Sequence, residues 1–243
     1  MPKTNSLKRF VRRVMPLEFR QTAAQTRREI KDWSSGIVFP RLRGGDQWPS
    51  RVEITQPVMP SPLIENKLSN VRRGASLIDM SQMEPDGCWS FWSQVGRPSA
   101  RNGFVSGRNL VNGRLVTQIG GGLCQLSSLI YHLALQSGLD IVERHAHSID
   151  IYREEDRFTP LGSDATVVWG FKDLRLHNPH PFPVSIGCML HEMRLTGQIR
   201  SAEALPKHVI DFVADDVSLG RVGVKTIING AEQWQTYYER RPD

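Results

Sequence analysis

A run of three glycines, directly before the strongest helical pattern in the chain, constrains the fold more than any other feature. The glycines occupy positions 120–122, and apolar residues then recur at helical spacing over 123–137. Gly138 supplies a helix stop. Glycine adopts backbone angles and permits close approaches that other residues disfavour. The pattern therefore predicts a helix over about 123–137 that begins at an unusual loop.

Short strand-like segments surround this helix. They lie at 141–142, 149–151, 165–169, 174–176, 184–186 and 193–199. Asn-Gly pairs at 112–113 and 229–230 are hairpin signals. A further short helix is expected over 64–76. We predict an α+β fold in which the central helix packs on a mostly antiparallel sheet.

Composition divides the chain into four parts. Residues 1–35 look like a basic helical segment, and residues 36–62 are rich in Pro and Gly, which favours an irregular connector. Within that connector, 52–54 fits a short edge strand. A compact domain is expected over 63–200, followed by a C-terminal β extension over 201–243.

The formal net charge is +6, and much of the excess lies near the N-terminus. The residues are Lys3, Lys8, Arg9, Arg12, Arg13, Arg20, Arg27, Arg28 and Lys31. Two interpretations remain open: a solvated basic helix interrupted at Pro16, or a segment that binds an anionic membrane surface or nucleic acid in a charge-led, salt-sensitive way. No specific nucleic-acid partner is expected.

Targeting signals are not evident in the sequence. Lys and Arg interrupt every apolar run near the N-terminus, which argues against a secretory signal. No stretch approaches the ~20 apolar residues of a transmembrane helix. We therefore predict a cytoplasmic protein, either free or peripheral to a membrane.

Cysteine usage points to a free thiol. The three cysteines are Cys88, Cys124 and Cys188. They are odd in number and widely spaced, which indicates neither a disulfide framework nor a thiolate zinc site. Cys124 lies at the predicted helix start, where unpaired N–H groups and the helix dipole stabilise an anion. Its pKa should therefore fall, as a nucleophilic thiol requires.

The loop before the helix also offers donors for a developing negative charge. Backbone N–H groups at Gly121, Gly122 and Gln125 are candidates for an oxyanion site. The triple glycine is not followed by the Lys and Ser or Thr of a phosphate-binding loop. The pattern therefore favours acyl chemistry over nucleotide binding.

A nucleophilic cysteine needs a base and a group that orients the base. His145 and His147 alternate, so on a strand both imidazoles would face the helix start. Asp164 opens the next predicted strand and is the candidate orienting group. The order cysteine, histidine, acid is that of papain-like and transglutaminase-like enzymes, which is an analogy only.

Simpler interpretations stay open for the same residues. Cys124 could be a small buried hydrophobe, and the two histidines could lie on a half-exposed strand. Cys124, His145 and His147 could also bind a metal, but no fourth ligand is evident. We therefore predict no metal and no cofactor.

The segment from residue 120 to 148 resembles the VanW family. The matching letters are GGGLCQLSSLIY, followed by ALQSGLDIVERHAHS. The resemblance covers about 63–195. Further matching pieces lie at 66–70, 91–96, 112–113, 164–167 and 173–178.

The resemblance implies a function, because some domains of this type act as cysteine-dependent L,D-transpeptidases that cross-link peptidoglycan. Cys124 would then form an acyl-enzyme on a tetrapeptide stem, and a second amine would resolve the thioester. His147 would be the base, His145 a helper or substitute, and Asp164 the orienting group. The alternative is a non-catalytic accessory protein that binds a peptide or cell-wall precursor and is linked to cell-wall metabolism or glycopeptide resistance. Whether the protein is an enzyme stays open at this stage.

Overall fold

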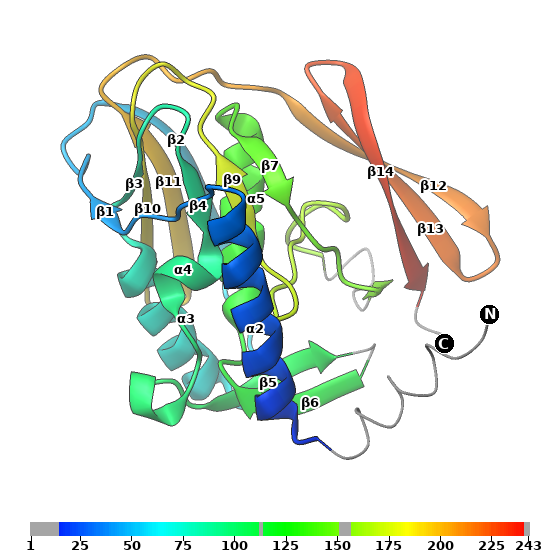
Figure 1. Ribbon diagram of the computed structural model, residues 1–243. Helices are drawn as coiled ribbons and strands as arrows, with labels where there is room; N and C mark the ends of the chain where they lie inside the picture. The colour runs from blue at the N-terminus through cyan, green and yellow to red at the C-terminus, as the bar shows by residue number, and fades with distance from the viewer. Residues whose placement is uncertain (1–14, 112–113, 151–156, 241–243) are drawn as a thin grey trace.

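Helix α5 (Leu123–Gln136) forms where the glycine run predicts a helix, and it lies at the centre of the molecule (Figure 1). It begins after Gly122, whose φ of 104° suits glycine alone. Its apolar residues, among them Leu126 and Ile130, are fully buried and anchor the main core. The computed structural model describes residues 15–111, 114–150 and 157–240.

A five-stranded antiparallel sheet and one further helix pack against α5. They are β1 (Leu42–Arg43), β2 (Ser50–Pro57), β3 (Ser81–Met83), β10 (Val184–His191), β11 (Arg194–Ser201) and α3 (Ile64–Ile78). The strand order is β1–β3–β10–β11–β2. A Cβ on Gly197 would lie 2.6 Å from Leu133 of α5, and one on Gly74 would lie 2.7 Å from Leu123. Glycine therefore lets α5 approach both the sheet and α3 closely.

The segment 36–62 contributes both edges of this sheet. The predicted edge strand at 52–54 is confirmed and is longer, because β2 pairs with β11 from residue 50 to residue 57. At the opposite edge, β1 pairs with β3. The expected irregular connector is thus partly sheet, whereas the domain boundary at residue 63 stays a prediction.

Smaller elements complete this part of the molecule. They are β4 (Cys88–Ser90), α4 (Phe91–Val95), the 3-10 turn η1 (Ala100–Asn102), β5 (Ser106–Val111), β6 (Arg114–Ile119), β7 (Asp140–Glu143) and β9 (Arg175–His177). Strands β5 and β6 pair as the predicted hairpin, whose turn at 112–113 lies outside the described residues. Strand β9 lies between β4 and β7 in a three-stranded antiparallel sheet.

The predicted strand at 165–169 is wrong. That segment has a single bridge, between Val168 and Lys172, and is otherwise extended loop. The Ala165 N–H donates to the Ser128 hydroxyl and the Thr166 N–H donates to a loop carbonyl. Because these groups are satisfied by a helix side chain and a loop, no neighbouring strand is paired.

A separate sheet closes the chain. It comprises β8 (Ile149–Asp150), β12 (Ile210–Ser218), β13 (Arg221–Ile228) and β14 (Ala231–Arg240). Its order is β12–β13–β14–β8, and only the short β14–β8 pair is parallel among the named strands. Asn229 and Gly230 have φ values of 50° and 82° and form the predicted hairpin turn. The predicted α+β fold, with a central helix on mostly antiparallel sheet, is confirmed.

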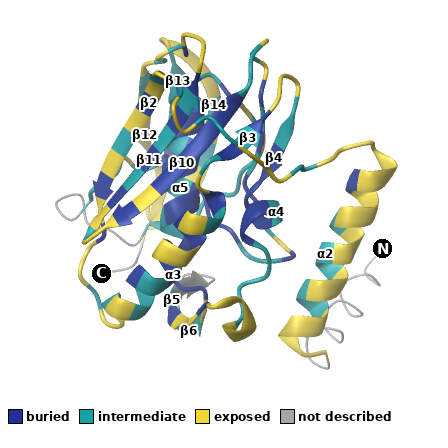
Figure 2. Cartoon of the chain, turned by 90° about the vertical axis from the view of Figure 1, so that its left-hand side faces the viewer, coloured by how far each residue is buried: buried dark blue, intermediate teal, exposed yellow. Residues whose placement is uncertain are grey.

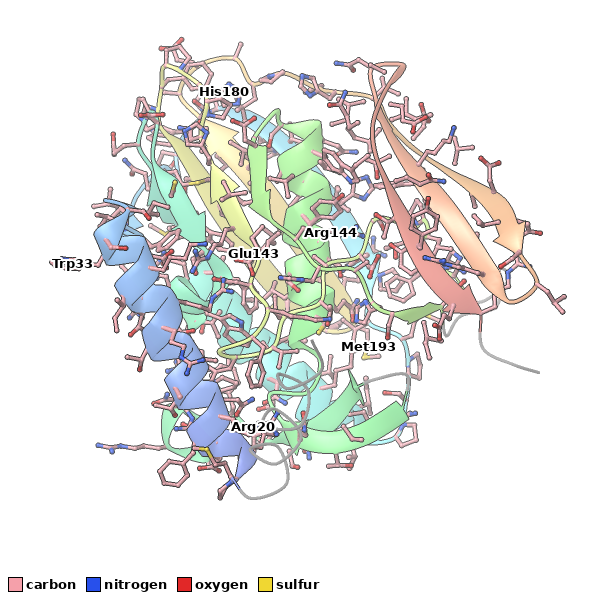
Figure 3. The ribbon with its side chains drawn as sticks, turned by 45° about the vertical axis from the view of Figure 1, so that its right-hand side comes forward. Arg20, Trp33, Glu143, Arg144, His180 and Met193 are labelled. Atoms are coloured by element: carbon pink, nitrogen blue, oxygen red, sulfur yellow. The ribbon has the colours of Figure 1, made fainter. Side chains whose placement is uncertain are left out.

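Helix α2 (Leu17–Ser34) lies on the outside of the molecule and begins directly after Pro16 (Figure 2). Its attachment is ionic, because Asp32 accepts two hydrogen bonds of 2.8 Å from Arg175. Trp33 is 82% exposed and points away from the rest of the chain (Figure 3). In the part of the chain that the structure describes, no helix is long and apolar enough to cross a membrane.

Candidate active site

Cys124 occupies the second position of α5 and faces a pocket of about 330 Å³. Its Sγ lies 3.5 Å from the Thr166 hydroxyl and 3.8 Å from the Val167 carbonyl oxygen. Within residues 15–111, 114–150 and 157–240, no acceptor is found for the Cys124 backbone N–H. An unpaired N–H at a helix start attracts negative charge, so the thiol and an anion donor lie on one residue.

His147 links the thiol to a carboxylate. Its Nδ1 donates to Asp164 Oδ2 at 2.7 Å, and its backbone N–H donates to the same oxygen, also at 2.7 Å. This leaves Nε2 as the ring nitrogen available to the thiol of Cys124, with which His147 interacts. The structure therefore brings three predicted site residues, Cys124, His147 and Asp164, into one connected set.

The electrostatics of this set favour a thiolate beside an imidazolium. Burial raises the pKa of Cys124, but hydrogen bonding and charge from His147 outweigh it, and the net pKa is lowered. Burial lowers the pKa of His147, but Asp164 and Cys124 raise it to about 10. The pKa of Asp164 falls to about 2, because its contacts with His147 and Arg144 overcome burial. The lowered pKa of Cys124 and the raised pKa of His147 both favour the placement of the shared proton on His147.

The other two thiols differ from Cys124. All three cysteines are free. Burial raises the pKa of Cys88, and the charge of Asp86 adds to that rise. Burial also raises the pKa of Cys188. Only Cys124 has a lowered pKa among the three, so the thiols can be distinguished by their reactivity.

A wall of hydrogen bonds surrounds Asp164. Its Oδ1 accepts from Arg144 Nη2 at 2.9 Å and from the Tyr238 hydroxyl at 2.5 Å. Arg144 also donates to the Gly162 carbonyl at 2.9 Å, and its guanidinium lies 4.9 Å from the ring centre of Tyr131. Tyr238 belongs to β14, so the C-terminal sheet supplies part of the site. We call Asp164, Arg144 and Tyr238 the Asp164 wall.

Two serines of α5 attach the Asp164 segment to the helix that carries the thiol. The Ser127 hydroxyl donates to the Ala165 carbonyl at 2.6 Å, and the Ser128 hydroxyl accepts from the Ala165 N–H at 2.9 Å. These contacts hold Thr166 beside Cys124. Because Ser127 and Ser128 lie on the same helix as Cys124, their bonds to Ala165 hold the thiol at a fixed position relative to the neighbouring Asp164 carboxylate.

Helix α3 fixes the glycine loop from the other side. Asn70 is completely buried, and its amide donates to the carbonyls of Val105 and Gly121, both at 3.0 Å. A Cβ on Gly121 would lie 2.3 Å from the Gly107 carbonyl carbon, so these backbones are in direct contact. We call Asn70, Gly107 and the residues 120–122 the glycine clamp.

The prediction that both histidines face the helix start is wrong for His145. Residues 144–148 form no strand, so the alternation of side chains does not hold. His145 Nε2 instead bonds Glu143 Oε1 at 2.9 Å, and His145 does not line the pocket. Glu143 lies on the side of α2, whereas Arg144 lies on the side of the C-terminal sheet (Figure 3). Of the two histidines, His147 is the one that lines the pocket with Cys124 and lowers the pKa of the thiol.

The predicted oxyanion donors are placed differently from one another. The Gln125 N–H donates to the Gly122 carbonyl, and its side-chain amide donates to Pro57. Gly121 is covered by Gly107, whereas Gly122 lines the pocket. The free donor nearest the thiol is the Cys124 N–H, which its position at the helix start could have indicated.

Other residues of the site escaped the sequence analysis. Arg144 directly precedes the two histidines of the same motif, but a charged residue at that position carries no signal for a carboxylate partner. Tyr238 lies 74 residues from Asp164 and gives no sequence signal. In the described ranges, no group of three His, Cys, Asp or Glu side chains is placed to hold a metal ion.

The fold and the site define an α+β protein with a cysteine–histidine–aspartate centre. Residues 66–200 match the family model described as "VanW like protein", and the chain belongs to the VanW family. It is 30% identical over 135 residues to the "Vancomycin B-type resistance protein VanW" of Enterococcus faecalis, which covers 56% of this chain and 49% of that protein. It is 33% identical over 122 residues to the "Uncharacterized protein YoaR" of Bacillus subtilis, which covers 50% of this chain and 39% of that protein.

The alignments leave much of each protein unmatched. The aligned region spans about half of the first relative and less of the second. No solved structure matches the chain. The matched residues include Cys124, His147 and Asp164, whereas Tyr238 lies beyond them.

Proposed function

We propose that this VanW-family protein is a cysteine-dependent acyl transferase of the L,D-transpeptidase type. Its substrates are peptidoglycan stem peptides or their precursors, and its intermediate is a thioester on Cys124. The observation that carries the proposal is that Cys124, His147 and Asp164 line one pocket, in which His147 bonds Asp164 at 2.7 Å and lowers the pKa of Cys124. In cysteine-dependent acyl transfer, a nucleophile bonds a base and the base bonds an orienting group; here these would be Cys124, His147 and Asp164.

In the first half-reaction, the Cys124 thiolate attacks the carbonyl carbon of a peptide bond. A C–S bond forms, and the carbonyl oxygen becomes an oxyanion next to the free Cys124 N–H. The His147 imidazolium then gives its Nε2 proton to the departing amine as the C–N bond breaks. The products are a thioester, a free amine and a neutral His147.

In the second half-reaction, an acceptor amine attacks the thioester carbon. Neutral His147 removes a proton from that amine, a new amide bond forms, and the C–S bond breaks. The thiolate of Cys124 and the imidazolium of His147 are thereby restored. Asp164 holds the ring through its 2.7 Å bond and stabilises the imidazolium throughout.

The pocket supports a peptide substrate. Its volume of about 330 Å³ lies within the usual range of small-ligand sites, which is roughly 300–1,000 Å³. The lining of the pocket combines apolar residues with polar groups near the thiol. One relative is named for vancomycin resistance, which supports the choice of a cell-wall peptide as the substrate.

Trapping of the thioester tests the proposal. The protein is incubated with a synthetic stem tetrapeptide, and peptide mass spectrometry is used to find the acyl group. We expect acylation at Cys124 alone, with Cys88 and Cys188 unmodified as internal controls. Acylation should vanish in Cys124→Ala. Tetrapeptide binding by Cys124→Ser without any acylation of the natural chain would instead establish the non-catalytic binding protein.

A second proposal concerns α2: we infer that it docks on the cytoplasmic face of an anionic membrane. Phe19, Ile30 and Trp33 are exposed on its outer surface, and Arg27 and Lys31 are exposed beside them. Exposed apolar and basic side chains on one helix match an anionic lipid interface. The substrates at that location would be peptidoglycan precursors.

Vesicle sedimentation tests this docking. We expect binding to phosphatidylglycerol vesicles, little binding to phosphatidylcholine vesicles, and release by added salt. The double variant Ile30→Ser, Trp33→Ser should bind more weakly, whereas Thr26→Ser, on the same helix, should bind normally. Equal binding of the double variant and the natural chain would contradict the proposal.

A further inference from the structure

Two basic side chains, Lys67 of α3 and Arg108 of β5, line the pocket of Cys124. Neither makes an ion pair or a side-chain hydrogen bond with a residue that the structure describes. Both are half-buried. Arg157, which also lines the pocket, differs because it bonds Asp150 at 2.6 Å.

Both basic residues lie against the glycine clamp at the start of α5. A Cβ on Gly122 would lie 2.8 Å from Lys67 Cγ, so the stem of this lysine packs on the glycine. A Cβ on Gly121 would lie 2.6 Å from the Arg108 backbone nitrogen. The stem of Lys67 and the backbone of Arg108 are therefore placed beside the loop that ends two residues before Cys124, and both side chains line the pocket.

Two like charges at a half-buried site are unfavourable without a counter-charge. Burial lowers the pKa of Lys67, and the positive charge of Arg108 lowers it further, which shows that the two charges repel each other. The two carboxylates that line the pocket in the described part of the chain are already engaged: Asp164 is bonded to His147, Arg144 and Tyr238, and Asp150 is bonded to Arg157. Among the described residues, the pair is thus left open to an anion of the substrate.

We propose that Lys67 and Arg108 bind a carboxylate of the substrate and thereby position its scissile carbonyl at Cys124. The inference rests on the proposed acyl transfer and names the group that this site recognises. Arginine can engage a carboxylate with two parallel hydrogen bonds, while lysine adds a compact charge. The substrate is then a peptide with a free carboxylate a few atoms from the bond that is broken.

Binding to an inactive chain separates this inference from the chemistry. Cys124→Ala is titrated by calorimetry with a stem tetrapeptide whose carboxylates are free, and with its twin in which they are carboxamides. We expect the free acid to bind about 10- to 100-fold more tightly than the amide. Equal affinities would overturn the inference, whether or not the natural chain forms a thioester.

Variants that remove a charge then test whether Lys67 and Arg108 are the residues that bind the carboxylate. In the Cys124→Ala background, Lys67→Met and Arg108→Gln should each remove most of the preference for the acid and leave binding of the amide unchanged. The controls Arg72→Gln and Arg101→Gln remove exposed charges from α3 and η1 and should keep the preference. A preference that survives in both pocket variants would contradict the assignment.

Phosphate is the competing anion, and pyrophosphate serves as its probe. We expect millimolar pyrophosphate to displace the acid peptide weakly and the amide peptide not at all. Strong binding of pyrophosphate that depends on Lys67 and Arg108, together with equal affinities for acid and amide, would show a phosphate site and overturn the carboxylate assignment.

Discussion

The glycine clamp and the Asp164 wall support the same thiol by different physical means. The clamp contains no charged side chain and works through backbone contact, with Asn70 donating to Gly121 and Gly107 touching the same residue. The wall is built from charges, with Arg144 and Tyr238 both bonded to Asp164. The clamp therefore supports the position of the loop before Cys124, whereas the wall acts on the protonation of the thiol through His147. Damage to the clamp should lower stability, and damage to the wall should change reactivity first.

The largest effect should follow the removal of His147, through which the wall acts on the thiol. In His147→Ala, acyl transfer should fall by about 10³-fold or more, because base and proton donor are lost together. Burial then dominates, and the pKa of Cys124 rises. Alkylation of Cys124 followed against pH by peptide mass spectrometry should therefore move to higher pH.

His145→Ala is the matched control for this variant, because His145 bonds Glu143 and not the thiol. Its alkylation profile should match that of the natural chain. A similar shift in both histidine variants would mean that His147 has no special role.

Gly121→Ala breaks the clamp without touching a charge. The added methyl would lie 2.3 Å from the Gly107 carbonyl carbon, and neither backbone can move freely. We expect a loss of about 3 kcal/mol in the free energy of unfolding, at the upper end for overpacking. Gly187→Ala is the control, because its nearest neighbour would lie 3.6 Å away. In denaturant unfolding, Gly121→Ala should have a clearly lower midpoint than Gly187→Ala. Equal midpoints would contradict the close backbone contact in the glycine clamp.

Protonation of Asp164 in acid should weaken the bonds of the wall and lower the stability of the folded chain. Its pKa is about 2 in the folded chain, against about 3.9 unfolded, so the unfolded chain binds more protons between these values. The carboxylate therefore contributes on the order of 2 kcal/mol above pH ~4, and this contribution is lost as the pH falls toward 2. Denaturant unfolding from pH 6 to pH 2.5 should show a shallower decline in Asp164→Asn than in the natural chain. Parallel curves would contradict the assignment.

Tyr238→Phe should have the smallest effect, because it removes one hydrogen bond of the wall and keeps the ring. We expect a loss of about 1 kcal/mol in stability and no more than a several-fold loss of acyl transfer. Tyr237→Phe is the control, since its hydroxyl bonds the neighbouring Gln235 and is exposed. A thermal melt and a thioester assay on both variants would show whether the C-terminal sheet matters to the site.

The features that the sequence predicted correctly depend on local patterns. Helix α5 follows from apolar periodicity and a glycine stop, and the turn at 229–230 follows from its Asn-Gly pair. The placement of Cys124, His147 and Asp164 around one pocket was also expected, because the residue types and their order suit one chemistry, and their catalytic roles stay a prediction. The sequence could not predict which of the two histidines faces the thiol, because that depends on the backbone conformation between β7 and β8.

The remaining features depend on contacts between distant segments. The 165–169 segment has the composition of a strand, yet its backbone bonds go to α5 and a loop. Tyr238 is an unremarkable aromatic residue in sequence and becomes a partner of Asp164 only when β14 folds back. Asn70 gave no sign of its role, because a buried amide in a helix looks the same whether it serves packing or a loop.

The separation of Tyr238 from Asp164 along the chain also sets an order of events during synthesis. The ribosome makes Cys124, His147 and Asp164 before β14, so the hydroxyl that completes the wall is added after the three residues it serves. Every residue of the glycine clamp precedes Cys124, so the contacts of the clamp do not require β14. The clamp is therefore independent of the C-terminal sheet, whereas the wall is complete only once β14 has joined β13.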